Sequence, residues 1–527
     1  METSELILGL LVTVAALSVV ARFVGVPYPI MLVIGGVGIA LVPGLPEVEL
    51  DPDLVLAIFL PPLLYSAAFF SSLRDLRADL RPISMAAIAL VLATMCAVAV
   101  VAHALIDGMP WAVAFALGAI VAPTDPIAAT SIARRMGLPR RIVTFLEGES
   151  LVNDASALIA YRVAVAAAIG GSFSLGEAAA RFVWAVIGGI AIGLVIGRVI
   201  AEIRRKLDDV PVEITISLFT GYAAFLPAEA AGVSGVLAVV TAGLVLGWMA
   251  PEISSSSMRT QGIPVWQTLV FLLNATLFVL IGLQLRTVID GLDGTSAATL
   301  AWWAIAVCAT VVGVRFLFGN TVPYLVRALD RRESQRARRV DWRSRAVIAW
   351  GGMRGGVSLA AALALPFETD AGAPFPFRDE LIFLTFAVIL FTVVVEGLTL
   401  PAVARASGLS DDGAEEREEV AARIAAADAA LARLDELAEE EWTRDDTVER
   451  VRGLYQYRQR RFAALDGGGD DSTVIEERSV AYQQLVRELL NAQHRALIDL
   501  RNQGVISSDV MRRIEREIDL EDERLEI

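Results

Sequence analysis

The feature that most constrains this chain is a series of apolar segments that recurs from the N-terminus to about residue 405. Each segment is roughly 20 residues long, the length of helix that crosses the hydrocarbon core of a bilayer. The chain is 55% hydrophobic and has a mean hydropathy of +0.59, which is high for a soluble domain. We therefore expect an all-α polytopic membrane protein, and the hydropathy excludes a soluble enzyme.

Division of the apolar part at proline, glycine and charged clusters predicts thirteen spans. They lie near residues 4–22, 28–45, 53–71, 82–106, 110–133, 142–169, 178–201, 211–228, 232–250, 263–285, 297–325, 344–366 and 379–405. We expect a transmembrane domain over residues 1–406 and a helical cytoplasmic domain over residues 407–527.

The basic residues between the spans predict the orientation. Connections after odd-numbered spans are rich in arginine, and those after even-numbered spans are poor in basic residues. By the positive-inside rule, the N-terminus lies outside and the C-terminal domain in the cytoplasm of a cell whose plasma membrane holds the protein. When the N-terminus is outside and the C-terminal domain is in the cytoplasm, the number of spans must be odd, as thirteen is.

The acidic balance of the chain belongs to its C-terminal part. From Asp411 onward there are 30 acidic residues and 17 arginines, which accounts for −13 of the formal net charge of −15. No basic face for phosphates is evident, so we expect no nucleic-acid partner. The two histidines, His103 and His494, are too few and too far apart for a zinc site, and we expect no cofactor.

Three polar stretches interrupt the apolar pattern at membrane depth: APTDPIAATS in span five, FLEGESLVNDASALIAY in span six and AWGGMRGGVS in span twelve. Pro123 and Pro126 bracket Thr124 and Asp125, and two prolines so close together disfavour a continuous helix. Unwound backbone is not tolerated against lipid, so we expect this segment to face protein or a water-filled cavity.

Spans five and twelve are seven apart, which suggests two inverted six-helix repeats with a discontinuous helix at the same place in each. Paired breaks of this kind indicate the central site of a transporter, where broken helices cross near the middle of the membrane. Asp125 and Arg354 are placed to offset the partial charges of the half-helix ends.

The acids of span six form a polar stripe if the span is a helix. Glu147, Ser150 and Asp154 share one face, and Glu149 and Asn153 share the adjoining one. Ionised acids in a transmembrane helix are costly and are by default functional. A buried ion-pair network that only holds helices together is the structural alternative.

Two other functions use similar residues. An intramembrane aspartyl protease could also use two membrane aspartates, but its usual glycine-aspartate pattern is not evident and it would not need paired helix breaks. An ion channel could line a pore with the same acids, and current that persists without proton exchange would identify it.

The motifs together resemble the cation:proton antiporter-1 family of sodium/proton exchangers. They are APTDP at 122–126, EGESLVND at 147–154, VGVRFLFG at 312–319, WGGMRGGVSLA at 350–360 and, in the third span, FLPPLLYSAAF at 59–69. The resemblance covers roughly residues 5–405, in order, and the combination of TDP with ESxxND is its most specific part.

The resemblance implies a homodimer in the lipid membrane, each protomer having a scaffold part and a mobile core. It implies that Asp154 is the main carboxylate for cation and proton, with Asp125 beside it, and that Thr124 and Ser150 are further oxygen ligands. Asn153 stands where electrogenic relatives carry a second aspartate, which implies electroneutral exchange.

Two further features follow from the same resemblance. Glu149 is similar to the family's structural acid, which pairs with an intramembrane arginine, here Arg315. Many relatives have a glutamate in the third span where this chain has Tyr65-Ser66. If that acid helps to hold the cation, the selectivity or the pH response of this chain differs from theirs.

Physical chemistry then suggests a mechanism. A hard monovalent cation must exchange its hydration shell for oxygen ligands, and a proton can occupy the same carboxylate. Desolvation raises the pKa of a carboxyl group, so that cation and proton compete at working pH. If the site moves only when one of them neutralises it, exchange is obligatory. The sequence does not distinguish Na⁺ from K⁺ or Li⁺.

Overall fold

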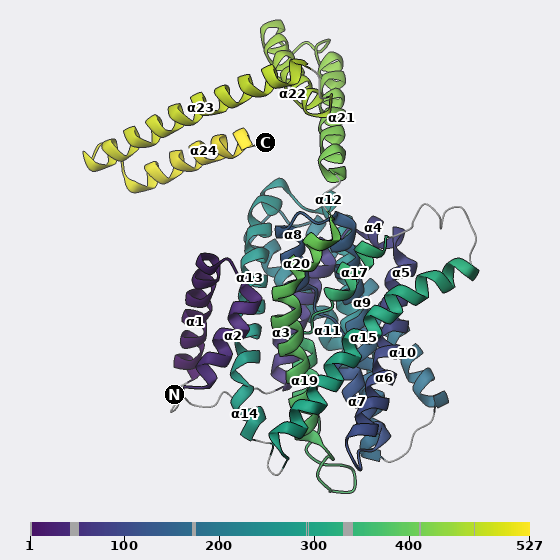
Figure 1. Ribbon diagram of the computed structural model, residues 1–527. Coiled ribbons are helices and arrows are strands. Elements are labelled where there is room, and N and C mark those ends of the chain that lie inside the picture. Colours follow the sequence, from purple (N-terminus) through teal and green to yellow (C-terminus); the bar gives the residue numbers. More distant parts are fainter. Residues whose placement is uncertain are drawn as a thin grey trace. The chain divides into compact units, whose positions relative to one another are not determined.

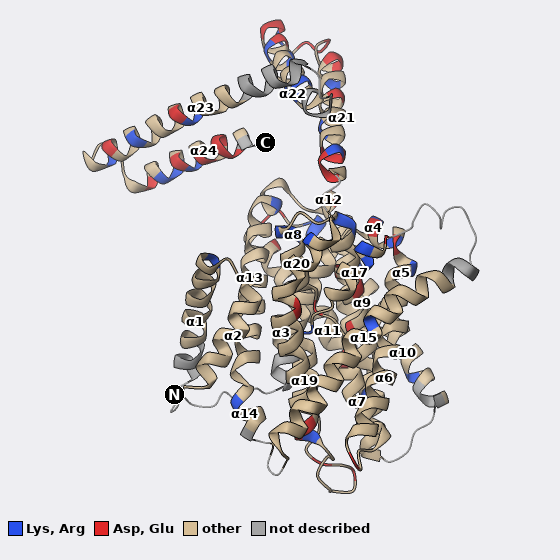
Figure 2. Cartoon of the chain, viewed as in Figure 1, with Lys and Arg blue, Asp and Glu red and all other residues tan. Residues whose placement is uncertain are grey.

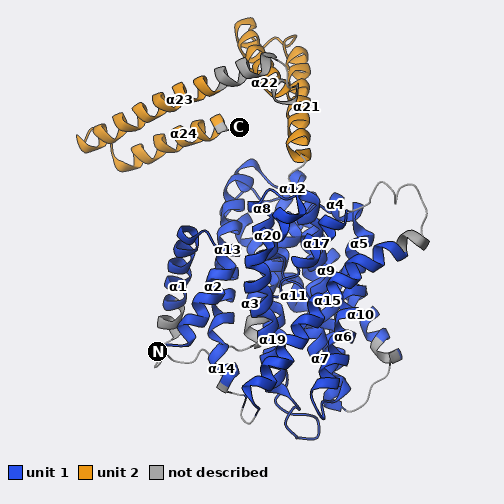
Figure 3. Ribbon diagram, in the orientation of Figure 1, with its two compact units in different colours: residues 1–410 blue, residues 411–527 orange. Residues whose placement is uncertain are grey.

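The structure of the protein is a computed structural model that describes residues 3–42, 52–170, 175–290, 292, 295–329, 341–409, 413–467 and 470–526. Its regular elements are helices, and the one β-bridge in these ranges joins Glu368 and Pro374. The chain forms two compact units, Met1–Ser410 and Asp411–Ile527 (Figure 3). Most of the arginine-rich connection after the eleventh predicted span lies outside the described residues.

Unit 1 is a bundle of helices (Figure 1). Their bounds are α1 (Thr3–Val24), α2 (Tyr28–Ala40), α3 (Pro52–Phe70), α4 (Leu73–Ala78), α5 (Leu80–Ser84), η1 (a π-helix, Met85–Leu90), α6 (Val91–Leu105), α7 (Trp111–Val121), α8 (Pro126–Arg135), α9 (Arg140–Gly170), α10 (Leu175–Arg205), α11 (Val210–Ala230), α12 (Gly235–Ile253), α13 (Ser256–Leu283), α14 (Leu285–Asp290), α15 (Ala297–Leu329), α17 (Trp342–Trp350), α18 (Gly356–Leu363), α19 (Arg378–Leu390), η2 (a π-helix, Phe391–Glu396) and α20 (Gly397–Ser407).

Within the described residues, every predicted span overlaps a helix or a group of consecutive helices. Among the described residues, nine helical segments are long and apolar enough to cross a membrane, and three shorter apolar helices lie in α1, α2 and α3. The chain is therefore an all-helical membrane protein. The exact count of thirteen crossings and the inverted repeats remain predictions.

Two hydrophobic clusters divide the bundle. The first is built mainly from residues of α2, α6 to α9, α13, α15 and α17 to α20, and the second from α3 and α10 to α13. Helix α9 contributes to both, so its side chains lie where the two clusters meet. The polar residues of its first half are therefore surrounded by helices of both clusters.

Glycines allow close helix contacts, as is common in membrane bundles. A Cβ atom on Gly36 of α2 would lie 2.5 Å from the Val279 carbonyl oxygen of α13, and one on Gly282 would lie 2.4 Å from that of Val33. Only glycine fits at both positions, so α2 and α13 touch backbone to backbone.

Charged residues are sparse within the bundle and gather at its ends, notably around α4 and α8 (Figure 2). Large apolar side chains such as Phe23, Trp184 and Leu317 are more than 60% exposed on unit 1. Such an apolar outer surface is what a lipid environment requires. The few charged groups inside the bundle therefore lie in an otherwise apolar environment.

Unit 2 consists of α21 (Ala414–Leu437), α22 (Asp445–Gly467), α23 (Asp470–Asn502) and α24 (Ser508–Glu526). Helix α21 packs on α22, and α23 forms a hairpin with α24 around Leu490, Leu497, Met511 and Ile518. The helical character of this part agrees with its sequence, and two of the three glycines at the predicted break, residues 468 and 469, lie outside the described residues.

Candidate ion-binding site

The first interruption separates α7 from α8. Residues 122–125 are not helical, and α8 begins at Pro126, whose missing amide proton is no loss at a helix start. Asp125 caps α8, because its Oδ1 accepts a hydrogen bond from the amide of Ile127 at 2.9 Å. The proline pair thus produces a break that ends in a carboxylate.

The second interruption separates α17 from α18 at residues 351–355. It meets the first directly: the Asp125 amide donates a hydrogen bond of 2.7 Å to the Met353 carbonyl oxygen. Gly355 lies against the same aspartate, and a Cβ atom there would be 1.9 Å from Asp125 Oδ2. The two broken helices therefore touch at Asp125.

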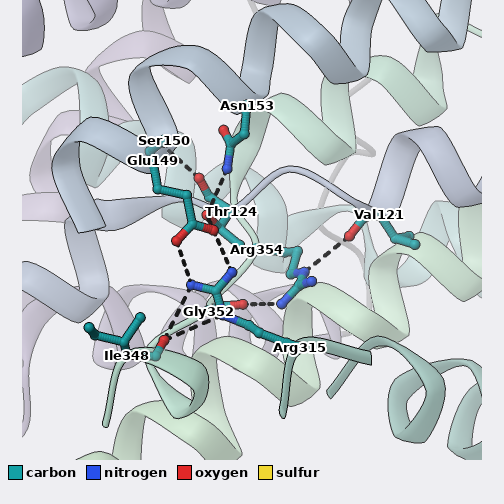
Figure 4. Close-up of polar contacts among 9 residues, drawn as sticks. All are labelled: Val121, Thr124, Glu149, Ser150, Asn153, Arg315, Ile348, Gly352 and Arg354. Atoms are coloured by element: carbon teal, nitrogen blue, oxygen red, sulfur yellow. Dashed lines mark hydrogen bonds and ion pairs between the residues drawn. The ribbon is translucent and has the colours of Figure 1, made fainter. Parts of the chain in front are cut away.

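Arg354 fastens the two interruptions together (Figure 4). The side chain is buried; its Nε donates to the Val121 carbonyl oxygen at the end of α7 at 3.0 Å, and its Nη1 donates to Gly352. Its amide donates to Thr392 Oγ1 of η2 at 3.0 Å. A cation next to the carbonyl end of a helix is stabilised by the helix dipole. That Arg354 offsets the charge of the half-helix ends remains a prediction.

Glu149 of α9 and Arg315 of α15 form a buried, two-pronged ion pair. The Nη1–Oε1 distance is 2.5 Å and the Nη2–Oε2 distance is 2.9 Å, and Arg315 Nη2 also donates to the Ile348 carbonyl oxygen at 3.2 Å. The side chains are 2% and 4% exposed. The structure thus brings together two residues whose pairing the family resemblance implied.

Thr124 connects the first interruption to α9 (Figure 4). Its hydroxyl accepts a hydrogen bond from Asn153 Nδ2 at 2.8 Å and donates to Glu149 Oε1 at 3.4 Å. Ser150 Oγ donates to the Thr124 carbonyl oxygen at 2.8 Å. Three residues of one helix turn therefore fix the position of the unwound segment.

Asp154 lies one residue beyond this group and is 6% exposed. Asp125 is the other carboxylate at the crossing. Within the described ranges, neither carboxylate takes part in an ion pair, and Asn153 Oδ1 is buried without a hydrogen-bond partner. Asp125 Oδ1 caps α8, which leaves Asp125 Oδ2, the Asp154 carboxylate and the Asn153 amide oxygen available at the crossing. Oxygens of this kind are what a site for a hard cation or a proton requires.

Glu147 is not part of this group, although helical spacing predicts it on the same face as Ser150 and Asp154. Its carboxylate forms an ion pair of 2.8 Å with Arg134, and the Glu147 and Arg134 side chains are 33% and 67% exposed. Helix α9 begins at Arg140, so Glu147 lies only two turns from the helix start. Helical spacing shows which face of the helix a residue occupies, but not how deep in the bundle the residue lies.

Two buried acids, Glu396 and Glu213, were not identified from the sequence. Glu396 is 1% exposed and lies in η2, near Arg354. Glu213 of α11 is 2% exposed, and Arg204 Nη2 donates to its Oε1 at 2.9 Å and to Ser254 Oγ at 2.9 Å. The signal for Glu396 was a single acid in FTVVVEGL, and that for Glu213 a charge close to a predicted span end.

The third-span position, Tyr65-Ser66, holds no charged side chain. Ser66 is buried, and its hydroxyl donates to the Leu63 carbonyl oxygen of its own helix at 2.9 Å. Serine carries no charge, so this position contributes no charge to the crossing. Among the described residues, no cluster of three or more His, Cys, Asp or Glu side chains is arranged to hold a metal ion.

Comparisons with known proteins agree with this architecture. The family model "Sodium/hydrogen exchanger, transmembrane" matches residues 9–406. An uncharacterized Na⁺/H⁺ exchanger of Mycobacterium tuberculosis is 38% identical over 99% of this chain and 97% of its own length. A sodium, potassium, lithium and rubidium/H⁺ antiporter of Bacillus subtilis is 33% identical over 76% of this chain and 61% of its own.

Among solved structures, the sodium proton antiporter MjNhaP1 of Methanocaldococcus jannaschii is similar in fold. The match has a TM-score of 0.60 and 20% sequence identity, and it covers 77% of this chain and 98% of the other. At this identity the likeness concerns the fold alone.

Proposed function

Because the chain belongs to the transmembrane sodium/hydrogen exchanger family, a family of transporters and not of enzymes, we propose that it exchanges Na⁺ for H⁺ across the plasma membrane. The observation that carries this proposal is the pair of carboxylates, Asp125 and Asp154, at the crossing of two interrupted helices. In this proposal, cation and proton compete for Asp154, with Asp125, Thr124, Ser150 and Asn153 supplying further oxygens.

The roles of the remaining charges follow from their contacts. Glu149 neutralises Arg315, and Arg354 is bonded to carbonyl oxygens, so the ion pair and hydrogen bonds described for these arginines go to groups other than Asp154. If the acids served only a buried ion-pair network that holds the helices together, each acid would need a basic partner. Asp154 has no such partner among the described ion pairs, so this alternative does not account for it. Transport requires instead an acid that is free to be neutralised by its substrates. No cofactor enters the cycle, since the exchanged ions are themselves the substrates.

The alternating-access part of the proposal rests on the division of the bundle. The interrupted helices belong to the first hydrophobic cluster, and α9 lies between the two clusters. Movement of the interrupted helices against the second cluster would expose the site to each side in turn. We further propose a homodimer with its N-terminus outside and unit 2 in the cytoplasm; the mass of the purified protein and the sidedness of a C-terminal tag test these two points.

Replacing Asp154 with asparagine should abolish exchange, because an amide cannot bind a proton and binds a cation only weakly. The measurement is the rate at which an added Na⁺ gradient changes the internal pH of proteoliposomes, and a fall to about 1% of the wild-type rate or below is expected. The matched control is Glu147→Gln on the same helix, which should leave the rate close to that of wild type. Full exchange by the Asp154→Asn protein would contradict the proposal.

The same vesicles distinguish the transported cation and the stoichiometry. We expect Na⁺ to dissipate a preset pH gradient faster than K⁺, and an imposed membrane potential to leave the rate unchanged, because Asn153 contributes no second charge. An equal or faster response to K⁺ would favour the alternative of K⁺/H⁺ exchange, for which the broad cation range in the name of the Bacillus subtilis relative is the specific argument. A rate that follows the membrane potential would contradict one-for-one exchange.

A further inference from the structure

Helix α23 of unit 2 carries apolar side chains that face solvent. Tyr482, Leu485 and Leu489 are 56%, 61% and 55% exposed, and they follow one another at intervals of three and four residues. This spacing places side chains on one face of a helix. The side chains that pack on α24, which lies beside α23 (Figure 1), are on another face and include Leu490 and Leu497. The first face therefore remains exposed after the α23–α24 hairpin has formed.

The exposed face continues along α23 as a heptad repeat. Its side chains, all exposed, are Tyr482, Leu485, Leu489, Ala492, Ala496 and Asp499, and we call them the α23 stripe. They occupy the first and fourth positions of the repeat in turn, which are the contact positions of a two-stranded coiled coil. The stripe extends over about 26 Å of helix, so it is long enough to pack against a second helix.

A lipid surface is an unsuitable occupant for the α23 stripe. From Asp411 onward the chain has 30 acidic residues and 17 arginines. Helices that lie on membranes are usually rich in basic residues, because the surface of the cytoplasmic leaflet is negative. An acidic domain is repelled by such a surface, so the occupant is better sought among helices of complementary shape and charge.

A second copy of α23 fits the stripe when the two helices run antiparallel. In the register that places Leu489 opposite Ala492 of the partner subunit, the heptad repeat also places Leu485 opposite Ala496 of the partner subunit. Each of these layers combines a large side chain with a small one, which allows close packing. Because a two-fold axis relates the helices, every such contact occurs twice.

The charged residues beside the stripe agree with this register. Glu488 and Arg495 each precede a residue at the first position of the repeat, and interhelical ion pairs form on this flank. The antiparallel register brings Glu488 next to Arg495 of the partner subunit, and the symmetry repeats the pair. At each end of the stripe, Tyr482 lies opposite Asp499 of the partner subunit, to which a phenol hydroxyl can donate a hydrogen bond.

A parallel pair is less compatible with the same side chains. It would place Asp499 against Asp499 of the partner subunit in a contact layer, and like charges at an interface are unfavourable. It would also place Glu488 next to Gln493 of the partner subunit, so the flanking ion pairs would be lost. The side chains of α23 therefore favour the antiparallel arrangement.

We propose that α23 is an interface between two copies of this chain, in which the two α23 helices pair antiparallel through the α23 stripe. The inference rests on the homodimer of the proposed function, because association of the membrane domains brings the second α23 within reach and raises its effective concentration. It adds a contact between the two copies of unit 2 that is separate from any contact between the membrane domains.

Cysteine cross-linking of the full-length protein in liposomes tests the interface. The background carries Cys96→Ala and Cys308→Ala, so that the introduced cysteine is the reactive one. Ala492→Cys lies close to the two-fold axis and should give covalent dimers with a short thiol-to-thiol reagent. Asn491→Cys is the matched control, because this neighbouring residue is also exposed but lies on the other side of the helix; it should give mainly monomer.

Leu485→Cys tests the direction of the helices. In the antiparallel register its two copies lie about 16 Å apart along the helix axis, and it should give mainly monomer. In a parallel pair the two copies would share one layer and would cross-link readily. Efficient covalent dimers of Leu485→Cys would therefore overturn the antiparallel pairing.

Charge reversal distinguishes specific pairing from random contact. Glu488→Arg in the Ala492→Cys protein places like charges on both flanks and should lower the yield of covalent dimer about fivefold. Addition of Arg495→Glu restores opposite charges and should return the yield to that of Ala492→Cys alone. A yield that does not fall with the first change, or does not recover with the second, would overturn the inference.

The remaining outcomes separate the inference from the proposed function. A dimeric mass without cross-linking of Ala492→Cys would overturn the inference and leave the proposed homodimer intact, whereas a monomeric mass would overturn both. Protection of Ala492→Cys from a water-soluble maleimide by liposomes, without cross-linking, would identify lipid as the occupant and would also overturn the inference.

Discussion

Replacing Arg315 alone with glutamine should destabilise the protein more than replacing Arg315 and Glu149 together. The single change leaves the Glu149 carboxylate, which is 2% exposed, without a cation, and its remaining side-chain partner is the Thr124 hydroxyl at 3.4 Å. Breaking a buried pair from one side costs about 3–5 kcal/mol, whereas neutralising both partners removes the uncompensated charge. Thermal unfolding of the purified proteins in detergent measures the difference.

The control for this comparison is the exposed pair formed by Arg134 and Glu147. Arg134→Gln should change the unfolding free energy by about 1 kcal/mol or less, because exposed ion pairs contribute little. Equal stability of Arg315→Gln and the double variant Arg315→Gln/Glu149→Gln would show that the buried pair does not behave as a coupled unit.

Substitution of Gly355 by alanine should reduce exchange by about tenfold or more, because misplacement of a reacting group by about an ångström has effects of this size or larger. The reason is space and not backbone conformation: Gly355 has an extended φ of −143°, but its Cβ atom would lie 1.9 Å from Asp125 Oδ2. The Asp125 carboxylate must move away from its present position. The readout is the Na⁺-driven pH change in proteoliposomes, normalised to the amount of folded protein.

Gly313→Ala in α15 is the corresponding control. Nothing lies within 4 Å of a Cβ atom at Gly313, so the added methyl group meets open space. Its exchange rate should equal that of wild type. If Gly355→Ala also exchanges at the wild-type rate, Asp125 is not held where the structure places it, or its position is unimportant for transport.

Local sequence patterns predict much of this architecture. The length of the apolar runs predicts the helices, and Pro123 with Pro126 predicts the break before α8. The four glycines around Met353 and Arg354 indicate the second break in the same way. These signals are short-range, because backbone chemistry alone interrupts a helix.

Contacts between distant segments could not be obtained from such patterns. Arg315 lies 166 residues after Glu149, and only the family resemblance suggested that they pair. The bond between Asp125 and Met353 depends on how two helices cross, which no periodicity encodes. Glu396 was overlooked because a single acid gives no spacing. Glu147 was placed on the polar stripe of span six because a helical repeat does not tell how far from the membrane surface a residue lies.

The bond from the Asp125 amide to Met353, together with that from Arg354 to the end of α7, has a mechanical consequence. Half-helices joined in this way cannot slide past each other without losing both links at once. In the transport cycle proposed above, the crossing would therefore move as one rigid piece together with its ion. The conformational change would then fall to the connecting segments and to the surfaces around the crossing.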